Sequence, residues 1–393
     1  MSLGTSISLK DLESDPDPIL ARLREEEPVC FIEELGMWFV TRWDDVVFME
    51  NHPNLFSAAT EPSFLRRALG ENMLTMDTPK AERSRNIMLP PFQAGGIAGN
   101  FVSERLSGIA NQLIGNFATS GEANLLTSYA EPLSASSLAA VLGLDSYGWN
   151  QVWEWCSGLC ADIANFSNDP KLTTVGNQAR NSLGAILDQR IDELRTKPDD
   201  SAIAVFCTST SNDEPLSQEE IINNIRLMIS GGINEPRDGI GLVVATVLTT
   251  EGLHDELVAD PTLWRRCVEE VLRLHTPVGT ITRQTTEDII LRKTKIPKGS
   301  LVAGVLRSAN LDEERWTNPE CFDLHRREGN HAAFALGDHR CLGEWLGRQV
   351  VRIGAQLLFE RLPNLRIVEK ESIILHGFEF RGPTSLNCCW EVL

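Results

Sequence analysis

Residues 217–250 would form one long helix if Pro236 did not stand in the middle. A proline inside a helix removes a backbone hydrogen bond, so it kinks or opens the helix. Gly231 and Gly232 come just before it. The sequence therefore predicts a long helix that is weakened in its middle, which is typical of a place where another group fits against the backbone.

Helical patterns dominate the rest of the chain, and helical periodicity returns over residues 342–362. Two stretches, about 25–60 and about 280–310, show short β patterns instead. The C-terminus predicts a strand, a turn at Gly382-Pro383 and a second strand. No repeat, low-complexity tract or linker divides the sequence. We therefore expect one domain over residues 1–393, mainly α with small β-sheets.

The composition excludes several classes of protein. A formal net charge of −19 argues against a general nucleic-acid binder, which needs a basic face. The nine cysteines are scattered and odd in number, which indicates reduced thiols and a cytoplasmic protein. No cysteine and histidine cluster has zinc spacing. No apolar stretch approaches the ~18 residues that a membrane span needs, so we expect no membrane association.

A single cysteine stands in the stretch "FALGDHRCLG", residues 334–343. Cys341 lies where a loop meets a predicted helix, and the positive end of a helix dipole favours a thiolate. Gly337 and Gly343 allow the backbone to approach a flat ligand or to turn tightly around the sulfur. The alternative is a buried structural cysteine at a helix cap.

The spacing of this stretch resembles the haem-binding loop of the cytochrome P450 family, in which a cysteine thiolate is the ligand of the haem iron. The resemblance implies haem b as the cofactor and Cys341 as the ligand of its iron. The loop residues that it implies for cofactor binding are Phe334, Gly337, His339, Cys341 and Gly343.

A second group of motifs follows the family order. Glu270 and Arg273 stand three residues apart, so they share one helix face and can pair. Arg326 lies in "NPECFDLHR", which is similar to the family segment whose arginine completes a Glu-Arg-Arg triad. Buried charges need partners, and this triad would supply them. Taken alone, the Glu270–Arg273 spacing also fits an ordinary surface pair.

Two further segments resemble the parts of the family that bind the haem propionates. Arg283 stands where the family has a propionate-binding arginine, and its forked donors suit that role. "MDTPKAERSRN" is similar to the helix that faces the propionates. A histidine is common there where Ala81 stands, whereas the arginine four residues on is retained as Arg85. The resemblance implies that Arg85, Arg283 and His339 hold the propionates.

The resemblance extends from about residue 15 to the C-terminus and includes "WFVTRWDDVVFMENHPNLFS", which is similar to the N-terminal sheet and its following helix. It implies the mainly helical, prism-shaped fold of the family, with small β-sheets. One haem would lie buried between two long helices.

The interrupted helix departs from the family pattern. Most members have an acid and an alcohol after a small residue and a glycine, and this pair helps to deliver protons to bound dioxygen. Here Asn234 replaces the acid and Glu235 replaces the alcohol. Glu235 could supply the proton route through water, so we take Asn234 and Glu235 as candidate catalytic residues. Alternatively, Glu235 is only a polar group that opens the helix beside Pro236.

The resemblance implies a monooxygenase that inserts one oxygen atom from O₂ into a small apolar substrate, aromatic compounds included. Glu235-Pro236 and "FRGPTSL", residues 380–386, resemble bacterial aryl-ether O-demethylases that act on guaiacol-like compounds. The reaction would be a hydroxylation or an O-demethylation. Two alternatives remain open: a haem-thiolate peroxygenase, isomerase or dehydratase that needs no external electrons, and a non-catalytic haem-binding sensor.

The sequence contains no flavin domain, so we expect electrons from a ferredoxin or flavodoxin with its NAD(P)H-dependent reductase. A local basic face for that partner would consist of Arg83, Arg85, Arg340, Arg348 and Arg352. The substrate pocket is expected to draw on the stretches 62–73, 229–235, 278–281 and 378–380. Its candidate residues are Ile229, Gly232, Val278, Ile281, Phe378 and Phe380.

Overall fold

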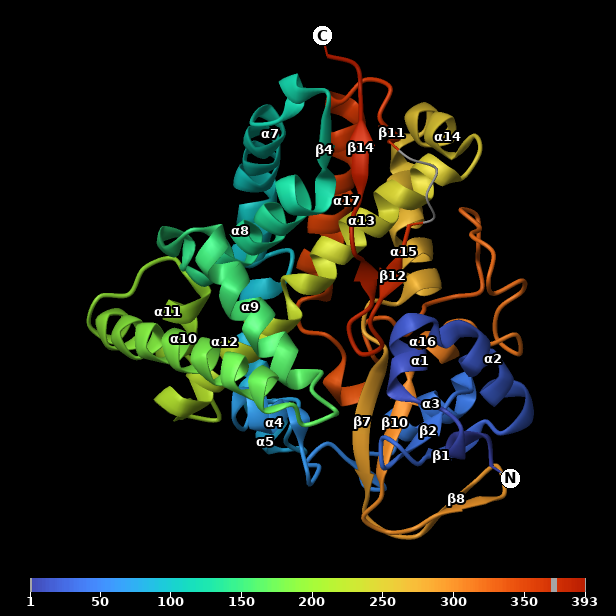
Figure 1. Ribbon diagram of the computed structural model, residues 1–393. Helices are drawn as coiled ribbons and strands as arrows, with labels where there is room; N and C mark the ends of the chain where they lie inside the picture. The colour runs from blue at the N-terminus through green and yellow to red at the C-terminus, as the bar shows by residue number, and fades with distance from the viewer. Residues whose placement is uncertain (1, 369–372, 393) are drawn as a thin grey trace.

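The structure of the protein is a computed structural model that describes residues 2–368 and 373–392. Helices form most of it, and the sheets are small, so the predicted fold class is confirmed. Figure 1 shows the helices α1 (Leu9–Ser14) and α2 (Pro16–Glu26) beside the largest sheet, while the long helices of the middle of the chain lie on the other side. Among the described residues, every helix is too short or too polar to cross a lipid bilayer.

The interrupted helix forms two helices, α12 (Gln218–Gly231) and α13 (Asn234–Thr249). The break lies just before Pro236, not at it, because this proline occupies the first turn of α13, where its missing N–H is not needed. The carbonyl of Ile233, the N-cap residue of α13, accepts the first helical hydrogen bond from the N–H of Arg237 at 3.2 Å. The hydroxyl of Ser134 donates a second hydrogen bond to the same carbonyl at 2.5 Å, so this carbonyl beside the break is fully satisfied.

Helix α13 crosses the centre of the molecule and packs against α15 (Trp264–His275) and α17 (Glu344–Arg361) (Figure 1). Small residues bring α13 and α17 close together. A Cβ atom at Gly239 of α13 would lie 2.8 Å from the Val351 side chain of α17. A Cβ atom at Gly354 of α17 would lie 3.0 Å from the Ile240 side chain of α13. The glycines therefore fix the separation of the two helices.

The largest sheet joins the two stretches with β patterns. Its strands lie in the order β1-β2-β10-β7-β3. Strand β10 runs parallel to β2 and antiparallel to β7. The bounds of the strands are Val29–Ile32 for β1, Met37–Val40 for β2, Phe56–Ser57 for β3, Thr280–Thr285 for β7 and Leu301–Val305 for β10.

The C-terminal segment is a hairpin that differs from the prediction. Gly382–Pro383 is strand β13, which pairs with β12 (Leu375–His376), so the turn lies earlier than expected, between these two strands. The hairpin is tied to the N-terminal helix α1. The N–H of Gly377 donates to the carbonyl of Glu13 at 2.9 Å, and Arg381 Nη2 donates to the carbonyl of Ser14 at 3.2 Å.

The remaining elements surround this framework. The further strands are β4 (Glu122–Asn124), β5 (Thr210–Ser211), β6 (Glu214–Pro215), β8 (Ile289–Leu291), β9 (Thr294–Ile296), β11 (Arg366–Ile367) and β14 (Asn387–Cys389). The further α-helices are α3 (Trp43–Glu50), α4 (Phe64–Leu69), α5 (Lys80–Met88), α6 (Ile97–Phe101), α7 (Ser107–Gly115), α8 (Glu131–Leu142), α9 (Trp149–Ile163), α10 (Pro170–Thr196), α11 (Ala202–Thr208), α14 (Leu253–Ala259) and α16 (Leu306–Ala309).

Candidate active site

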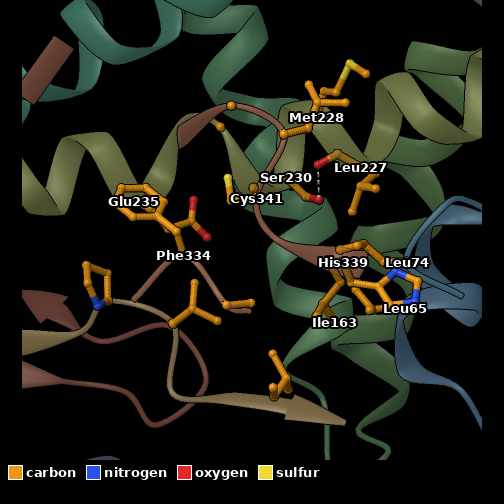
Figure 2. A pocket seen from close by; sticks show the side chains of 18 of the residues that line it. Leu65, Leu74, Ile163, Leu227, Met228, Ser230, Glu235, Phe334, His339 and Cys341 are labelled. Carbon is orange, nitrogen blue, oxygen red and sulfur yellow. Dashed lines mark hydrogen bonds between the residues drawn. The ribbon is translucent and has the colours of Figure 1, made fainter. Parts of the chain in front are cut away.

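A cavity lies where the break between α12 and α13 faces the loop of residues 333–343 and the start of β7. It offers about 340 Å³ to water-sized molecules, and its wall is mainly apolar. Figure 2 shows the sulfur of Cys341 and the carboxyl group of Glu235 at this cavity. Aromatic rings also line it, from Phe64, Phe92, Phe166, Phe334 and Phe380.

The loop that carries Cys341 folds back on itself. The N–H of Cys341 donates to the carbonyl of Phe334 at 2.8 Å. Gly337 has a φ of +60°, and a Cβ atom there would lie 2.5 Å from the carbonyl oxygen of Glu50, so the turn requires glycine. Gly337 therefore shapes the loop and does not itself line the cavity. Helix α17 begins directly after Gly343, which is its N-cap.

Cys341 lies on the cavity wall. Its side chain is only partly accessible, because the sulfur faces the cavity. Burial raises the pKa of Cys341 to about 11, and the N–H of Gly343 lowers it only in part. The backbone N–H at the helix end favours the thiolate as expected, but burial outweighs its effect on the pKa of Cys341. A bound metal ion would reverse this balance, because a coordinating thiol loses its proton.

One edge of the cavity is positive. Arg85 from α5, Arg283 from β7 and His339 from the cysteine loop all line it. Arg283 is almost fully buried, and its Nη2 atom lies 2.8 Å from Oε1 of Glu50. Burial lowers the pKa of His339 to about 4, and the charge of Arg283 lowers it further. Ala81, on the same helix as Arg85, is buried and leaves the edge without a further histidine.

These residues fit a haem. The wall offers one thiol as an axial ligand, and its positive edge suits two carboxylates, as the propionates require. Glu50 pairs with Arg283, whereas Arg85 has no ion pair among the described residues, and His339 adds a neutral ring that can donate a hydrogen bond. The aromatic and aliphatic wall suits a large flat apolar group. Cys341, Arg85, Arg283 and His339 are therefore the residues that would hold the haem.

Glu235 is the acid that faces the cavity from the first turn of α13. Its Oε2 atom is buried and has no hydrogen-bond partner in the described part of the chain. Burial raises the pKa of Glu235 to about 8, and the charges of Asp238 and Glu379 raise it further. A carboxyl group with such a pKa holds its proton near neutral pH and can exchange it with a group in the cavity.

Asn234 is placed differently from the prediction. It does not line the cavity, and its Nδ2 atom donates to Asp238 Oδ2 at 3.3 Å. Asp238 also binds Arg237 through Nη1 at 2.5 Å. Adjacent positions of a helix point in different directions, and here Glu235 and Pro236 face the cavity while Asn234 turns toward Asp238. The candidate catalytic role of Asn234 is corrected to that of a partner for Asp238.

The predicted pocket residues divide into two groups. Gly232, Val278, Ile281 and Phe380 line the cavity. The placement of two others in the pocket is wrong: Ile229 is buried in the helical core, and Phe378 stacks on the ring of Phe39 with the ring centroids 5.5 Å apart. Ile229 lies on the face of α12 that packs into the helical core, and Phe378 packs into the cluster that includes Phe39 of β2.

Sequence reasoning missed one acid of the cavity, Glu379. The hydroxyl of Thr280 donates to Glu379 Oε2 at 2.6 Å. Burial raises the pKa of Glu379 to about 7. The available signal was an acid between Phe378 and Phe380. In a short extended segment, an acid between two apolar residues either faces solvent or faces a functional site.

The Glu-Arg-Arg group is assembled as expected. Glu270 Oε2 accepts from Arg273 Nε at 2.9 Å, and its Oε1 accepts from Arg326 Nε at 2.8 Å. Arg273 is almost completely buried and also donates from Nη1 to the carbonyls of Asn310 and Pro319, both at 2.8 Å. The group therefore fastens the irregular segment before the cysteine loop to helix α15.

The expected basic face is largely neutralised by acidic side chains. Arg83 pairs with Glu220, Arg340 pairs with Glu344, and Arg348 pairs with both Glu269 and Glu344. The residues of the set without an ion pair in the described chain are Arg85, which lines the cavity, and Arg352.

Comparisons with known proteins agree with this site. The family model "Cytochrome P450" matches residues 245–363, a range that includes Glu270, Arg273 and Cys341. The chain is similar to the pulcherriminic acid synthase of Bacillus subtilis (strain 168), at 26% identity over 401 residues that cover 98% of each chain. It is also similar to the linalool 8-monooxygenase of Pseudomonas putida, at 25% identity with 95% of each chain covered.

A solved structure shares the architecture. The ligand-free structure of cytochrome P450 TbtJ1 matches with a TM-score of 0.88 at 26% identity, and the match covers 98% of this chain and 100% of that one. The likeness thus extends over the whole fold and includes the cysteine loop. The chain belongs to the cytochrome P450 family of haem-dependent monooxygenases, with haem b as its cofactor.

Proposed function

We propose that this monooxygenase hydroxylates or O-demethylates a small, mainly apolar substrate, aromatic compounds included. The observation that carries the proposal is the apolar cavity that places Glu235 and the aromatic rings in the same space as Cys341. A flat aromatic substrate would pack against these rings. Phe64 and Phe166 meet edge to face there, with their ring centroids 5.0 Å apart, which is a favourable arrangement for a third ring.

The side chains have separate tasks in this proposal. Cys341 would hold the haem from one wall, and Arg85, Arg283 and His339 would hold its propionates. When bound, the haem supplies the activation of O₂. Glu235 would deliver protons from the break between α12 and α13. The apolar wall excludes water and holds the substrate over the reactive centre.

For an aryl methyl ether, the proposed reaction consumes one O₂, two electrons and two protons. One oxygen atom enters a C–H bond of the methoxy group, and the other leaves as water. The resulting hemiacetal breaks its carbon–oxygen bond and gives a phenol and formaldehyde. The electrons come from a ferredoxin or flavodoxin with its NAD(P)H-dependent reductase.

Turnover with a surrogate ferredoxin, its reductase and NADPH tests the proposal. Guaiacol and related methoxyarenes should shift the oxidised haem toward high spin, stimulate O₂ consumption and release formaldehyde in equal amount to the phenol. Alkylbenzenes of the same size should be hydroxylated without formaldehyde. O₂ consumption that no member of this panel stimulates would contradict the proposed substrate class.

Peroxide-driven oxygenation is a second candidate function. The observation that favours it is that Glu235 faces the cavity at the break, whereas Asn234 beside it turns to Asp238, so these two adjacent positions do not form an acid–alcohol pair. Hydrogen peroxide carries its own protons, so its reaction depends less on a relay that delivers protons from solvent. Product formation with hydrogen peroxide that exceeds the reductase-supported rate would establish this function in place of the first.

A further inference from the structure

We propose that Glu379 and Thr280 form a recognition site for the polar end of the substrate, and that this end is a hydrogen-bond donor, either a hydroxyl group or a protonated amine. The inference deepens the proposed function, on which it rests. It concerns the side of the cavity formed by the C-terminal hairpin and the start of β7.

The pair is held rigidly by backbone contacts. The N–H of Gly279 donates to the carbonyl of Glu379 at 2.9 Å, and Val278 and Phe380 form an isolated β-bridge beside it. A Cβ atom at Gly279 would lie 2.1 Å from the carbonyl oxygen of Phe378, so glycine permits this close approach. The two segments therefore present the Glu379 carboxyl at a fixed place on the cavity wall.

The carboxyl group of Glu379 has no cationic partner within the described residues. Its one polar contact from a side chain is the hydroxyl of Thr280, at 2.6 Å from Oε2. Buried carboxylates are costly without partners, so burial raises the pKa of Glu379 to about 7. A ligand group that donates a hydrogen bond or carries a positive charge would supply the missing partner.

The direction of the hydrogen bonds decides the chemistry of the ligand. Thr280 already donates its hydroxyl proton to Glu379. Above its raised pKa of about 7, Glu379 is ionised and only accepts hydrogen bonds. The site therefore offers acceptor capacity and selects a donor. A ligand with only ether or carbonyl oxygens would find no donor at an ionised Glu379.

A second acid strengthens the preference. The charge of Glu379 contributes to the raised pKa of Glu235, so the two carboxyl groups share one cavity. The basic side chains of the wall are Arg85, Arg283 and His339, which fit the propionates, and Arg340, which pairs with Glu344. The substrate is therefore expected to place its apolar body among the aromatic rings and its donor group at Glu379.

Binding to the full-length haem-loaded protein tests the inference. Three matched ligands differ only at one end: 4-ethylbenzyl alcohol, 4-ethylbenzylamine and the methyl ether of the alcohol. Dissociation constants are measured by the spin-state shift of the haem and, independently, by calorimetry. We expect at least one donor ligand to bind about tenfold or more tightly than the ether, as a hydrogen bond to a charged group requires.

Two variants separate the two kinds of donor. Glu379→Leu should bring every ligand to within about twofold of the ether. Glu379→Gln keeps an acceptor oxygen and loses the charge, so it should weaken the amine and spare the alcohol. Thr280→Val removes the hydroxyl without touching the carboxyl. Retention of the far-UV circular dichroism and of the haem spectrum shows that each variant is folded.

Other outcomes overturn the inference. Equal affinity for donors and ether in the unchanged protein would do so, as would a donor preference that survives in Glu379→Leu. A spectral shift typical of nitrogen bound to iron would show the amine at the haem instead. Turnover of the ether without any donor preference would leave the proposed function intact and remove this inference alone. Binding of none of the three ligands would count against both.

Discussion

Burial raises the pKa of Cys341 to about 11, so the apolar cavity by itself favours the thiol. Only a bound iron ion would convert it into a thiolate. We expect Cys341→Ala to abolish the long-wavelength Soret band that the reduced protein gives with carbon monoxide. Cys321→Ala changes an exposed cysteine and should keep the band. A Cys341→Ala protein that retained the band would refute the ligand assignment.

Glu235 gives a pH-dependent prediction. Its pKa is raised to about 8, so its acid form is present below that pH and is lost as the pH rises through it. Oxygen-driven turnover that needs this proton should therefore decline above about pH 8. Glu235→Gln should slow this turnover by about 10²-fold, as loss of a general acid does, and should remove the decline. Steady-state rates across the pH range provide the measurement.

The control for Glu235 uses the other oxidant. Hydrogen peroxide brings its own protons, so peroxide-driven turnover should lose less activity in Glu235→Gln. If both reactions lost the same factor, Glu235 would act on substrate binding or on the shape of the cavity and not on proton delivery.

Single residues also show how far the site could be predicted from the sequence. Glu235 could be selected because it stands beside an unusual proline in a predicted helix. The orientation of Asn234, away from the cavity, could not be predicted. It depends on the precise start of α13, which determines the direction of each side chain in the first turn. Glu379 could not be placed either, since its position depends on how the C-terminal hairpin meets β7.

Among the elements, the break between α12 and α13 depends on a small residue. A Cβ atom at Gly232 would lie 2.6 Å from the Met228 carbonyl oxygen and 3.0 Å from the Leu138 side chain. Gly232→Ala should lower the free energy of unfolding by about 1–3 kcal/mol, the usual cost of overpacking. Unfolding in urea measures this change in the free energy of unfolding.

The adjacent glycine is the matched control for this element. A Cβ atom at Gly231 would meet nothing within 4 Å, so Gly231→Ala should leave the midpoint of unfolding almost unchanged. Equal losses in the two variants would mean that the break tolerates no side chain for a reason other than contact with Met228 and Leu138.

Helices and strands could be predicted where the hydrophobic pattern extends over many consecutive residues. The helix after Cys341 begins and ends within two residues of the expected bounds. The Gly382-Pro383 turn was wrong because these residues pair with β12 and thus belong to a strand. A two-residue strand carries almost no periodicity, so local patterns cannot identify it.

For the whole molecule, the Glu-Arg-Arg group is the contact that joins α15 to the segment before the cysteine loop. Glu270→Gln would leave Arg273 and Arg326 without their shared carboxylate in a buried place. We expect a loss of about 3–5 kcal/mol in the free energy of unfolding, as for broken buried ion pairs, together with faster loss of haem on heating. Denaturant titration and absorbance during heating measure the two effects.

The control is an exposed pair elsewhere on the molecule. Glu26 pairs with Arg22 at the surface, where such pairs contribute little. Glu26→Gln should therefore change neither stability nor haem retention. Similar losses from Glu26→Gln and Glu270→Gln would show that burial of the triad is not what makes it important.

The overall fold could be predicted because its class follows from abundant helical patterns and its family from several motifs in fixed order. The cavity as a whole could not. Its wall combines α4, α5, the break before α13, the cysteine loop and the C-terminal hairpin. Which side chains of these distant segments meet depends on tertiary packing, and this information is spread over the entire chain.

The hydrogen bonds between the C-terminal hairpin and the backbone of Glu13 and Ser14 have a practical consequence. Anything that disturbs the first helix, such as a fused tag or a trimmed terminus, also disturbs the hairpin that carries Glu379. A variant altered only at the start of this chain should therefore keep the haem absorption spectrum and change in substrate preference.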